Sequence, residues 1–353
     1  MTPPDPVTRS WLVRIPQVFD GIADDVLIRL GAVSSTRLGQ DYHLIKTATP
    51  EAIHHSEAAK FAVWNLPMDH TWPCNPRRMD GFVEKAAQAL WRKFGERKPQ
   101  GLFVGALHPA SRDRYFRDLA SNLRGRALQL FPKLAAGTVE EQDPALETLF
   151  GLVGKEGLFC GIQSPRASNG FYPGGSKFID QDSPETISRA GAKIAEALHY
   201  LRLHRPPPPE GCHWLELGAS PGGMTAELLA RGQRVTAVDR AVLDHRLSRR
   251  PGLTFVHGDV TEFHPGPGVL FDAILCDMNG PAELSLEQVI RLLPSLRRGG
   301  LVIFTLKLPR VENVDEPSHL FRTIVHRAKG ELRLFAQTHL TYNRHELTLF
   351  FEK

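Results

Sequence analysis

The stretch from His213 to Asp239 constrains the fold more than any other part of the sequence. An apolar run, Trp214–Leu217, ends in the glycine-rich segment Gly218–Gly223; helix-forming residues follow, and a second apolar run ends at Asp239. This order predicts a strand, a tight turn, a helix and a second strand, the repeating unit of doubly wound α/β domains. An acid about 20 residues after such a turn can accept hydrogen bonds from ribose hydroxyls, so the stretch predicts a nucleoside cofactor site.

The residues of the turn restrict the kind of ligand. Gly218, Gly222 and Gly223 permit positive φ angles and close approach of a ligand to the backbone, and Pro221 stiffens the turn. The pattern is not the G-x-G-x-x-G of dinucleotide binders, and no lysine follows the glycines as in a P-loop. A tight turn in any doubly wound domain would explain the glycines alone equally well, so the later segments decide between the two interpretations.

Composition places the chain in a broad class. Its 353 residues suffice for roughly two or three domains, and contents of 42% hydrophobic and 23% charged residues are typical of globular proteins. No apolar run approaches the length of a membrane span, and the start lacks the pattern of a secretory signal, so we expect a cytoplasmic protein without a membrane partner. The four cysteines form no C-x-x-C pair, which predicts free thiols rather than a zinc site or a disulfide framework.

The basic residues are unevenly distributed, although the formal net charge is only +4. A group of arginines in the last third comprises Arg246, Arg249, Arg250, Arg297, Arg298, Arg310 and Arg344. Such a group could contact a polyanion, but exposed arginines are also ordinary features of a solvated surface.

The N-terminal half contains two groups of elements. Strand-like Trp11–Ile15 and Tyr42–Lys46, with a helical segment at Asp24–Leu30, predict a small α+β unit. A second α/β unit is expected from helices at Met79–Phe94 and Arg112–Leu130 and strands at Gly101–Leu107, Leu146–Gly154 and Glu156–Gln163.

Four finer expectations concern this second unit and its end. Residues Asp69–Arg78 are rich in turn formers and predict a loop. In Met79–Phe94, helical spacing places Phe82, Ala86, Ala87, Leu90 and Trp91 on one core-facing side. Arginines of the next helix, Arg114, Arg117, Arg124 and Arg126, could touch nucleic acid or simply face solvent. The polar connector Ser164–Lys177 predicts the domain boundary just beyond it.

The C-terminal part alternates helices and strands. We expect three helices: Ser183–Leu203, capped by Ser183-Pro184-Glu185; Leu284–Leu296, stopped by Gly299-Gly300; and Glu316–Ala328. We expect strands at Leu253–Val256, Phe271–Asp277, Leu301–Leu308, Leu332–Thr341 and Leu347–Phe351. Alternation predicts a mostly parallel sheet with ligands outside the carboxyl ends of its strands, and the last two strands predict an antiparallel hairpin.

Four charged residues fall where this sheet would place a ligand. Asp277 and Lys307 end two apolar strands, Glu346 begins another, and Lys193 lies on the helix before the first strand. Each alone is explained as a turn cap, a sheet-edge charge or a surface lysine, but two lysines and two acids at one rim predict an acid–base site. Asp259, after a further strand, could accept from an adenine amino group.

The motifs LGASPGGMT, CDMNGP, FTLKLP and RHELT resemble those of the FtsJ-type ribose 2′-O-methyltransferases. That family binds S-adenosylmethionine on a Rossmann-like sheet and uses a Lys-Asp-Lys-Glu tetrad, which Lys193, Asp277, Lys307 and Glu346 match in order. The resemblance implies no metal, and it implies a cofactor site formed by Gly218, Ser220, Pro221, Gly222, Gly223, Met224, Asp239, Asp259 and Asp277. Two departures are Glu216, where the family usually has aspartate, and Met224, where it usually has an aromatic residue.

Within the family, the likeness over Ser164–Lys353 is greatest to enzymes that methylate a cytidine ribose of bacterial large-subunit ribosomal RNA. This implies an α/β fold with a Rossmann-like S-adenosylmethionine-dependent methyltransferase sheet at the C-terminus and N-terminal α+β RNA-binding domains. The expected domains are 1–55 (ferredoxin-like), 56–178 (THUMP-like) and 179–353 (methyltransferase). RNA, as large-subunit rRNA or its precursor, is the implied partner, and we expect a monomer.

The implied mechanism assigns Lys307 as the base that removes the ribose 2′-hydroxyl proton. Burial and the neighbouring Lys193 should lower the pKa of Lys307, whereas Asp277 and Glu346 should oppose that shift. Two alternatives are a methyltransferase acting on a small molecule or protein and a non-catalytic RNA-binding or ribosome-assembly factor. The first has no need of the two lysines, and the second would tolerate loss of a tetrad residue.

Overall fold

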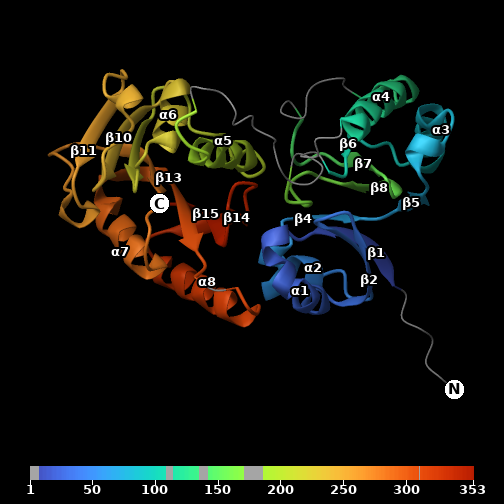
Figure 1. Cartoon of the computed structure of the whole chain (residues 1–353), viewed down its shortest axis with the longest axis horizontal. Helices are drawn as coiled ribbons and strands as arrows, with labels where there is room; N and C mark the ends of the chain where they lie inside the picture. Colours follow the sequence, from blue (N-terminus) through green and yellow to red (C-terminus); the bar gives the residue numbers. More distant parts are fainter. Residues whose placement is uncertain (1–7, 109–113, 135–141, 171–185, 310) are drawn as a thin grey trace. The chain divides into compact units, whose positions relative to one another are not determined.

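The computed structural model describes residues 8–108, 114–134, 142–170, 186–309 and 311–353. The chain forms two compact units, Met1–Phe178 and Ile179–Lys353 (Figure 1). The expected helix cap at Ser183-Pro184-Glu185, the end of the connector Ser164–Lys177, and Arg112 and Arg310 lie outside the described residues.

The first sheet of unit 1 is antiparallel, with the order β2-β3-β1-β4. Its elements are β1 (Arg9–Arg14), α1 (Ala23–Arg29), β2 (Ala32–Leu38), β3 (Tyr42–Thr47), α2 (Ala52–His55) and β4 (Trp64–Pro67). The two expected strands and the expected helix are confirmed. Because β4 pairs with β1, this sheet extends past the boundary expected at residue 55.

The second sheet of unit 1 has the order β5-β8-β7-β6, in which only β6 and β7 are parallel. Its elements are β5 (His70–Pro73), α3 (Phe82–Phe94), β6 (Gly101–Ala106), α4 (Tyr115–Leu130), β7 (Thr148–Gly154) and β8 (Gly157–Gln163). The loop expected at Asp69–Arg78 is therefore wrong in part. Strand β5 forms there because backbone pairing with β8 does not depend on side-chain pattern.

Helix α3 buries most of the face that its spacing predicted. Phe82, Ala86, Ala87 and Leu90 belong to an apolar cluster with α4 and the second sheet. Trp91 does not, since its side chain is 45% exposed. It lies at the margin of the face and meets Phe131 edge-on, with ring centroids 5.0 Å apart, so the assignment of Trp91 to the core is wrong.

A second apolar cluster of unit 1 draws residues from both of its sheets. Leu12 and Trp64 come from the first sheet, and Phe103 and Phe150 come from the second. The Trp64 and Phe150 rings meet edge-on at 5.8 Å. Shared burial of aromatic surface therefore joins the two sheets into one compact unit.

Unit 2 contains a seven-stranded sheet with the order β11-β10-β9-β12-β13-β15-β14. Its strands are β9 (His213–Leu217), β10 (Arg234–Asp239), β11 (Leu253–His257), β12 (Phe271–Cys276), β13 (Leu296–Lys307), β14 (Arg333–Thr338) and β15 (Glu346–Glu352). Neighbours from β11 to β13 are parallel, and β15 is antiparallel to both β13 and β14, as the sequence predicted.

Helices cover both faces of this sheet (Figure 1). Helices α5 (Ala190–Leu201) and α6 (Gly223–Ala230) lie on one face, and α7 (Ala282–Leu292) and α8 (Asp315–Ala328) lie on the other. Short 3-10 turns occupy Gln17–Ile22, Glu57–Phe61, Pro76–Arg78, His245–Leu247, Val260–Glu262 and Leu293–Ser295.

The expected stop of α7 at Gly299-Gly300 is wrong. The helix ends at Leu292, and β13 already begins at Leu296. Backbone hydrogen bonds from Gly299 N to Lys353 O (2.9 Å) and from Lys353 N to Gly300 O (3.1 Å) keep the glycines in the sheet. Pairing with the end of the chain therefore outweighs the local turn signal.

Two expectations from composition concern cysteines and membranes. All four cysteines are free, as predicted, and Cys160 and Cys276 are buried. Within the described ranges, no helix combines the length and the apolar character needed to cross a membrane.

The core of the seven-stranded sheet yields a stability prediction. Phe304 in β13 is 0% exposed, so Phe304→Ala should lower the free energy of unfolding by about 3–5 kcal/mol through lost burial and a residual cavity. Leu284→Ala, at a site that is 56% exposed, is the control and should change it by less than about 1 kcal/mol. Urea unfolding followed by tryptophan fluorescence measures both, and equal losses would contradict this account.

Candidate active site

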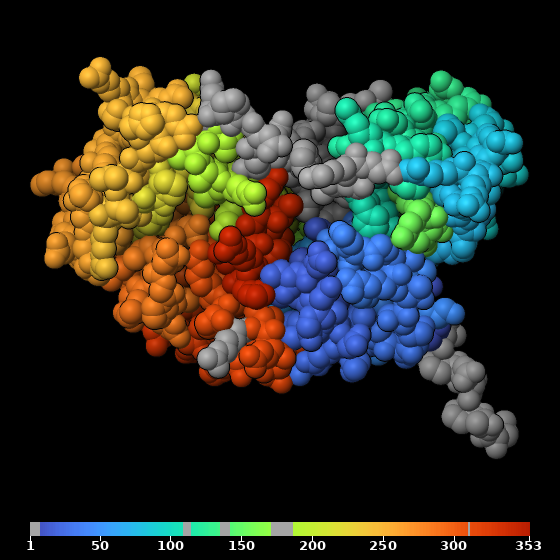
Figure 2. Space-filling model, viewed as in Figure 1, coloured from blue at the N-terminus to red at the C-terminus, as the bar shows by residue number. Residues whose placement is uncertain are grey.

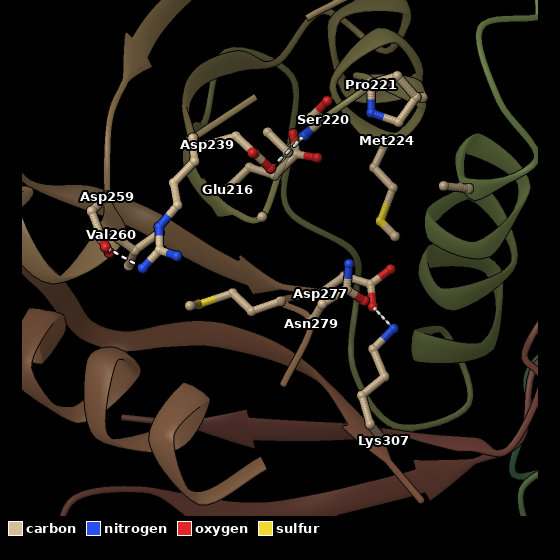
Figure 3. A pocket seen from close by; sticks show the side chains of 16 residues that line it. Glu216, Ser220, Pro221, Met224, Asp239, Asp259, Val260, Asp277, Asn279 and Lys307 are labelled. Carbon is tan, nitrogen blue, oxygen red and sulfur yellow. Dashed lines mark hydrogen bonds and ion pairs between the residues drawn. The ribbon is translucent and has the colours of Figure 1, made fainter. Parts of the chain in front are cut away.

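A pocket of about 350 Å³ opens in unit 2 at the carboxyl ends of β9, β10 and β12 (Figure 3). The chain passes from β9 to β10 on one side of the sheet, whereas β12 lies on the other side of β9. This reversal of strand order leaves a crevice in which doubly wound sheets bind ligands. Of the nine expected cofactor residues, eight line the pocket: Gly218, Ser220, Pro221, Gly223, Met224, Asp239, Asp259 and Asp277.

The glycines of the turn have different roles. Gly218 has a φ of 80°, and a Cβ there would lie 2.9 Å from the carbonyl oxygen of Asp277. Gly222 has a φ of 104°, and its Cβ would lie 2.3 Å from the side chain of Leu247. Gly222 is thus required for packing against Leu247. It is the one expected cofactor residue that does not line the pocket.

Two acids border the pocket at the ends of β10 and β11. Asp239 accepts hydrogen bonds from the backbone N–H of Ser220 (2.8 Å) and of Ala241 (2.7 Å), which fix its carboxylate beside the glycine turn. Asp259 accepts from the N–H of Thr261 (2.9 Å) and pairs with Arg240. Each carboxylate oxygen retains a lone pair for a ligand hydroxyl or amino group.

Arg240 is a pocket residue that sequence reasoning missed. It follows Asp239 directly, lines the pocket, and has a side chain that is 77% exposed. The hydrogen bonds from Thr261 and Arg240 hold the pKa of Asp259 below its usual value. The position of Arg240 directly after Asp239, at the end of β10, was the only sequence signal that could have placed it at the pocket.

The four charged residues expected at the rim meet in a closed ring of alternating charge. Lys307 Nζ lies 2.6 Å from Asp277 Oδ1 and 2.8 Å from Glu346 Oε1. Lys193 Nζ lies 2.6 Å from Glu346 Oε2 and 3.5 Å from Asp277 Oδ2. Each carboxylate therefore bridges both amines.

Four different elements supply the ring. Lys193 comes from α5, Asp277 follows β12, Lys307 ends β13, and Glu346 begins β15. In the antiparallel pairing of β13 with β15, Lys307 and Glu346 are direct partners. Side chains directly opposite each other on paired strands are close enough to interact, so the register itself brings this acid and base together.

The ring residues are mostly buried, with side-chain exposures between 11% and 24%. For Asp277, burial raises the pKa, but the two lysines overcome that effect and hold the pKa below its usual value. For Lys307, burial lowers the pKa in the expected direction, but Asp277 and Glu346 prevail and the net pKa is raised. Without a ligand, the Lys307 amine is therefore protonated at neutral pH.

A buried acid on α5 holds the segment that leads to Glu346. Glu196, which is 2% exposed, accepts hydrogen bonds from the backbone N–H and the hydroxyl of Thr341, both at 2.9 Å. Glu196 lies three residues after Lys193 on the same helix, and Thr341 lies in the connection between β14 and β15. The sequence analysis did not predict these hydrogen bonds of Glu196 with Thr341. The only sequence signal was an acid within an apolar stretch of helix.

Glu216, on β9, is a buried acid in the pocket wall. It is 3% exposed and accepts a 2.7 Å hydrogen bond from the hydroxyl of Thr225 on α6. Burial raises the pKa of Glu216 to about 8. The carboxyl group is therefore largely neutral at pH 7, whereas the lysines hold the pKa of Asp277 below its usual value.

Several arginines considered for polyanion contact are paired with acids instead. Arg246 lies 2.8 Å from Asp244, Arg297 lies 3.3 Å from Asp272, and Arg126 lies 2.6 Å from Glu84. In the part of the chain that the structure describes, no group of three or more His, Cys, Asp or Glu side chains is arranged to hold a metal ion.

The family model of the FtsJ-like methyltransferases matches residues 186–337, which cover most of unit 2 including the pocket. The resemblance that the motifs predicted is thereby confirmed for this part of the chain.

Curated relatives show which members of this family the chain is similar to. A ribosomal RNA large subunit methyltransferase M from Halorhodospira halophila is 33% identical over 167 residues, which make up 46% of this chain and 46% of the relative. Its namesake from Xylella fastidiosa (strain 9a5c) is 33% identical over 176 residues, 47% of each chain. The matching regions thus span about half the length of these relatives. Among solved structures, TrmN from Thermus thermophilus aligns with 98% of this chain and 99% of its own, at 15% identity and a TM-score of 0.39.

The buried Glu216 yields a pH prediction. Between its unfolded value of about 4.5 and its folded pKa of about 8, the folded chain binds one more proton than the unfolded chain, so Glu216 makes stability fall as pH rises through this range. Glu216→Gln keeps an acceptor for Thr225 and cannot ionise. We therefore compare the free energies of unfolding of the Glu216→Gln variant and the natural chain, both without cofactor. The value for the variant minus the value for the natural chain should increase from pH 5 to pH 8 by on the order of 4 kcal/mol.

Urea unfolding at a series of pH values measures this difference. Glu287→Gln, at an exposed site on α7 that is 55% accessible, serves as the matched control. A difference that does not change with pH would show that Glu216 is ionised in the folded state.

Proposed function

We propose that the chain is an S-adenosylmethionine-dependent RNA ribose 2′-O-methyltransferase that acts on a cytidine of large-subunit ribosomal RNA. The observation that carries this proposal is the buried Lys-Asp-Lys-Glu ring at the edge of the glycine-lined pocket. Burying charged groups costs folding stability, and clusters of buried titratable groups are typical of catalytic sites. A ring of this kind beside a nucleoside site therefore favours acid–base chemistry. The names of the relatives support large-subunit ribosomal RNA as the substrate, and the choice of a cytidine rests on the resemblance of the motifs.

The pocket residues fit S-adenosylmethionine, which supplies a methyl group activated by a positively charged sulfur. Gly218 leaves room for close approach of a ligand to the turn. Asp239 is held beside the turn in a position suited to ribose hydroxyls, and Asp259 is suited to the adenine amino group. The carboxylate of Asp277 lines the pocket beside Lys307, where it would favour a cationic ligand.

The proposed mechanism uses Lys307 as the base. Lys307 would accept the proton of the ribose 2′-hydroxyl as that oxygen bonds to the methyl carbon, while the methyl–sulfur bond breaks and S-adenosylhomocysteine leaves as a neutral thioether. Because the pKa of Lys307 is raised in the free protein, the amine must first lose a proton. A cationic cofactor held beside Asp277 would lower the pKa of the Lys307 amine and so favour the neutral form that the base requires. Lys193, Asp277 and Glu346 hold the Lys307 amine in position through the ring of ion pairs.

The two sheets of unit 1 are consistent with a ferredoxin-like domain and a THUMP-like RNA-binding domain. We propose that they carry the RNA contacts of a monomeric cytoplasmic enzyme that needs no metal. Such contacts would supply the binding energy for a large RNA while the chemistry occurs in unit 2.

The activity is tested by incubating the full chain with labelled S-adenosylmethionine and large-subunit rRNA that lacks its native modifications, then mapping the label. One 2′-O-methylcytidine is expected. Label on a different ribose would retain the chemistry and reject the cytidine target. Label on a metabolite or protein alone, or cofactor-independent RNA binding without transfer, would reject the proposal in favour of one of the alternatives.

The base is tested with Lys307→Ala and Lys307→Arg. Arginine retains the positive charge of the ring but cannot lose a proton in the working range, so both variants should lose about 10²–10⁴-fold in turnover. Cofactor affinity, measured by calorimetry, should be kept by the arginine variant. Turnover of the natural chain should rise with pH, because the pKa of Lys307 is raised. Near-normal turnover of Lys307→Arg would remove Lys307 from this role.

A further inference from the structure

A second pocket lies in unit 1, between helix α3 and the edge strand β5. It has a volume of about 570 Å³ and is lined by His70, Trp72, Lys85, Ala89, Arg92 and Lys93. This volume falls within the range of about 300–1,000 Å³ found for ligand sites. Three permanently charged or strongly basic side chains and no carboxylate line it, so its wall is suited to an anion.

Helical spacing explains why the cations gather on one side. Lys85, Arg92 and Lys93 are exposed residues of α3, and Lys93 lies one helical turn after Ala89, which also lines the pocket. Residues four and seven positions apart share a helix face, so Lys85, Ala89 and Arg92 form one continuous row. Figure 2 shows α3, in light blue, at the surface of the molecule.

The nearby acids are engaged elsewhere. Asp69, next to His70, lies 2.8 Å from Arg97, and Glu84, next to Lys85, receives two hydrogen bonds from Arg126, at 2.6 and 3.0 Å. Within the described ranges, Lys85, Arg92 and Lys93 make no ion pair. Three like charges on one wall repel one another, and a bound polyanion would relieve that repulsion.

An aromatic ring completes the wall. Trp72 stacks on Phe82, with centroids 5.7 Å apart and planes 19° from parallel, so the position of its indole is fixed. Trp72 is only partly buried and lines the pocket. Cations along a groove next to a fixed aromatic ring are the combination by which proteins hold single-stranded nucleic acid, with phosphates on the cations and a base against the ring.

We propose that this pocket binds a single-stranded segment of RNA, with phosphates on Lys85, Arg92 and Lys93 and a base against Trp72. The proposal rests on the proposed function for the choice of RNA, and it assigns to unit 1 a defined contact surface. A single strand is favoured over a duplex because the bases of a duplex are stacked on one another and not available to the indole.

The test uses the full chain and a fluorescent single-stranded oligoribonucleotide, with binding followed by anisotropy at several salt concentrations. Lys85→Ala/Lys93→Ala should weaken binding about tenfold, and the slope of log affinity against log salt should become less steep by about 1.4. Alanine is a good helix former, so α3 should remain intact. Lys46→Ala/Lys155→Ala removes the same charge from exposed sites of unit 1 outside the pocket and should leave both quantities nearly unchanged.

A second measurement reads the pocket directly. Acylation of Lys85 and Lys93 by an amine-reactive reagent should be protected by the oligonucleotide, whereas Lys46 should react equally with and without it. Equal affinities of the two double variants, or no protection of Lys85 and Lys93, would overturn the proposal. Tighter binding of a phosphorylated peptide of equal charge, or of an RNA duplex, would also overturn it.

The outcome is separable from that of the proposed function. If the chain methylates RNA but Lys85→Ala/Lys93→Ala binds RNA like its control, the pocket assignment fails and the activity stands. If no RNA is methylated but the oligonucleotide still binds through Lys85 and Lys93, the activity fails and the pocket assignment stands.

Discussion

The ion-pair ring of Lys193, Asp277, Lys307 and Glu346 is the interaction on which the rest of unit 2 depends. A single buried charge is strongly destabilising, and each ring member is tolerated because two partners of opposite sign contact it. The same pairing determines the chemistry, since it keeps Asp277 ionised and raises the pKa of Lys307. The free protein therefore holds the amine of Lys307 in the protonated form.

The architecture around the ring serves to bring four distant segments to one point. Parallel strands place the ends of β12 and β13 at the same edge of the sheet, and the register of β13 with β15 sets Lys307 opposite Glu346. Helix α5 is fixed to this end of the sheet by more than Lys193, because Glu196 accepts hydrogen bonds from Thr341 in the segment that leads into β15 and Tyr200 donates to the carbonyl oxygen of Gln337.

The sequence allowed the fold of unit 2 to be predicted well, because its signals are local and repeated: apolar runs, a glycine turn, and polar residues where strands end. The four ring residues were anticipated from their order in the family motifs, and the structure brings them together. What escaped prediction depends on partners distant in sequence. Strand β5 and the start of β13 exist through backbone pairing, Trp91 was misplaced at the margin of a helix face, and Arg240 and Glu196 gain their roles only from Asp259 and Thr341.

The contact of Gly218 with the backbone that carries Asp277 has a consequence for how such a chain can evolve. With less than 3 Å between a Cβ at position 218 and the carbonyl oxygen of Asp277, any larger residue would displace both loops at once. The loop after β9 and the loop that carries Asp277 are therefore constrained to change together.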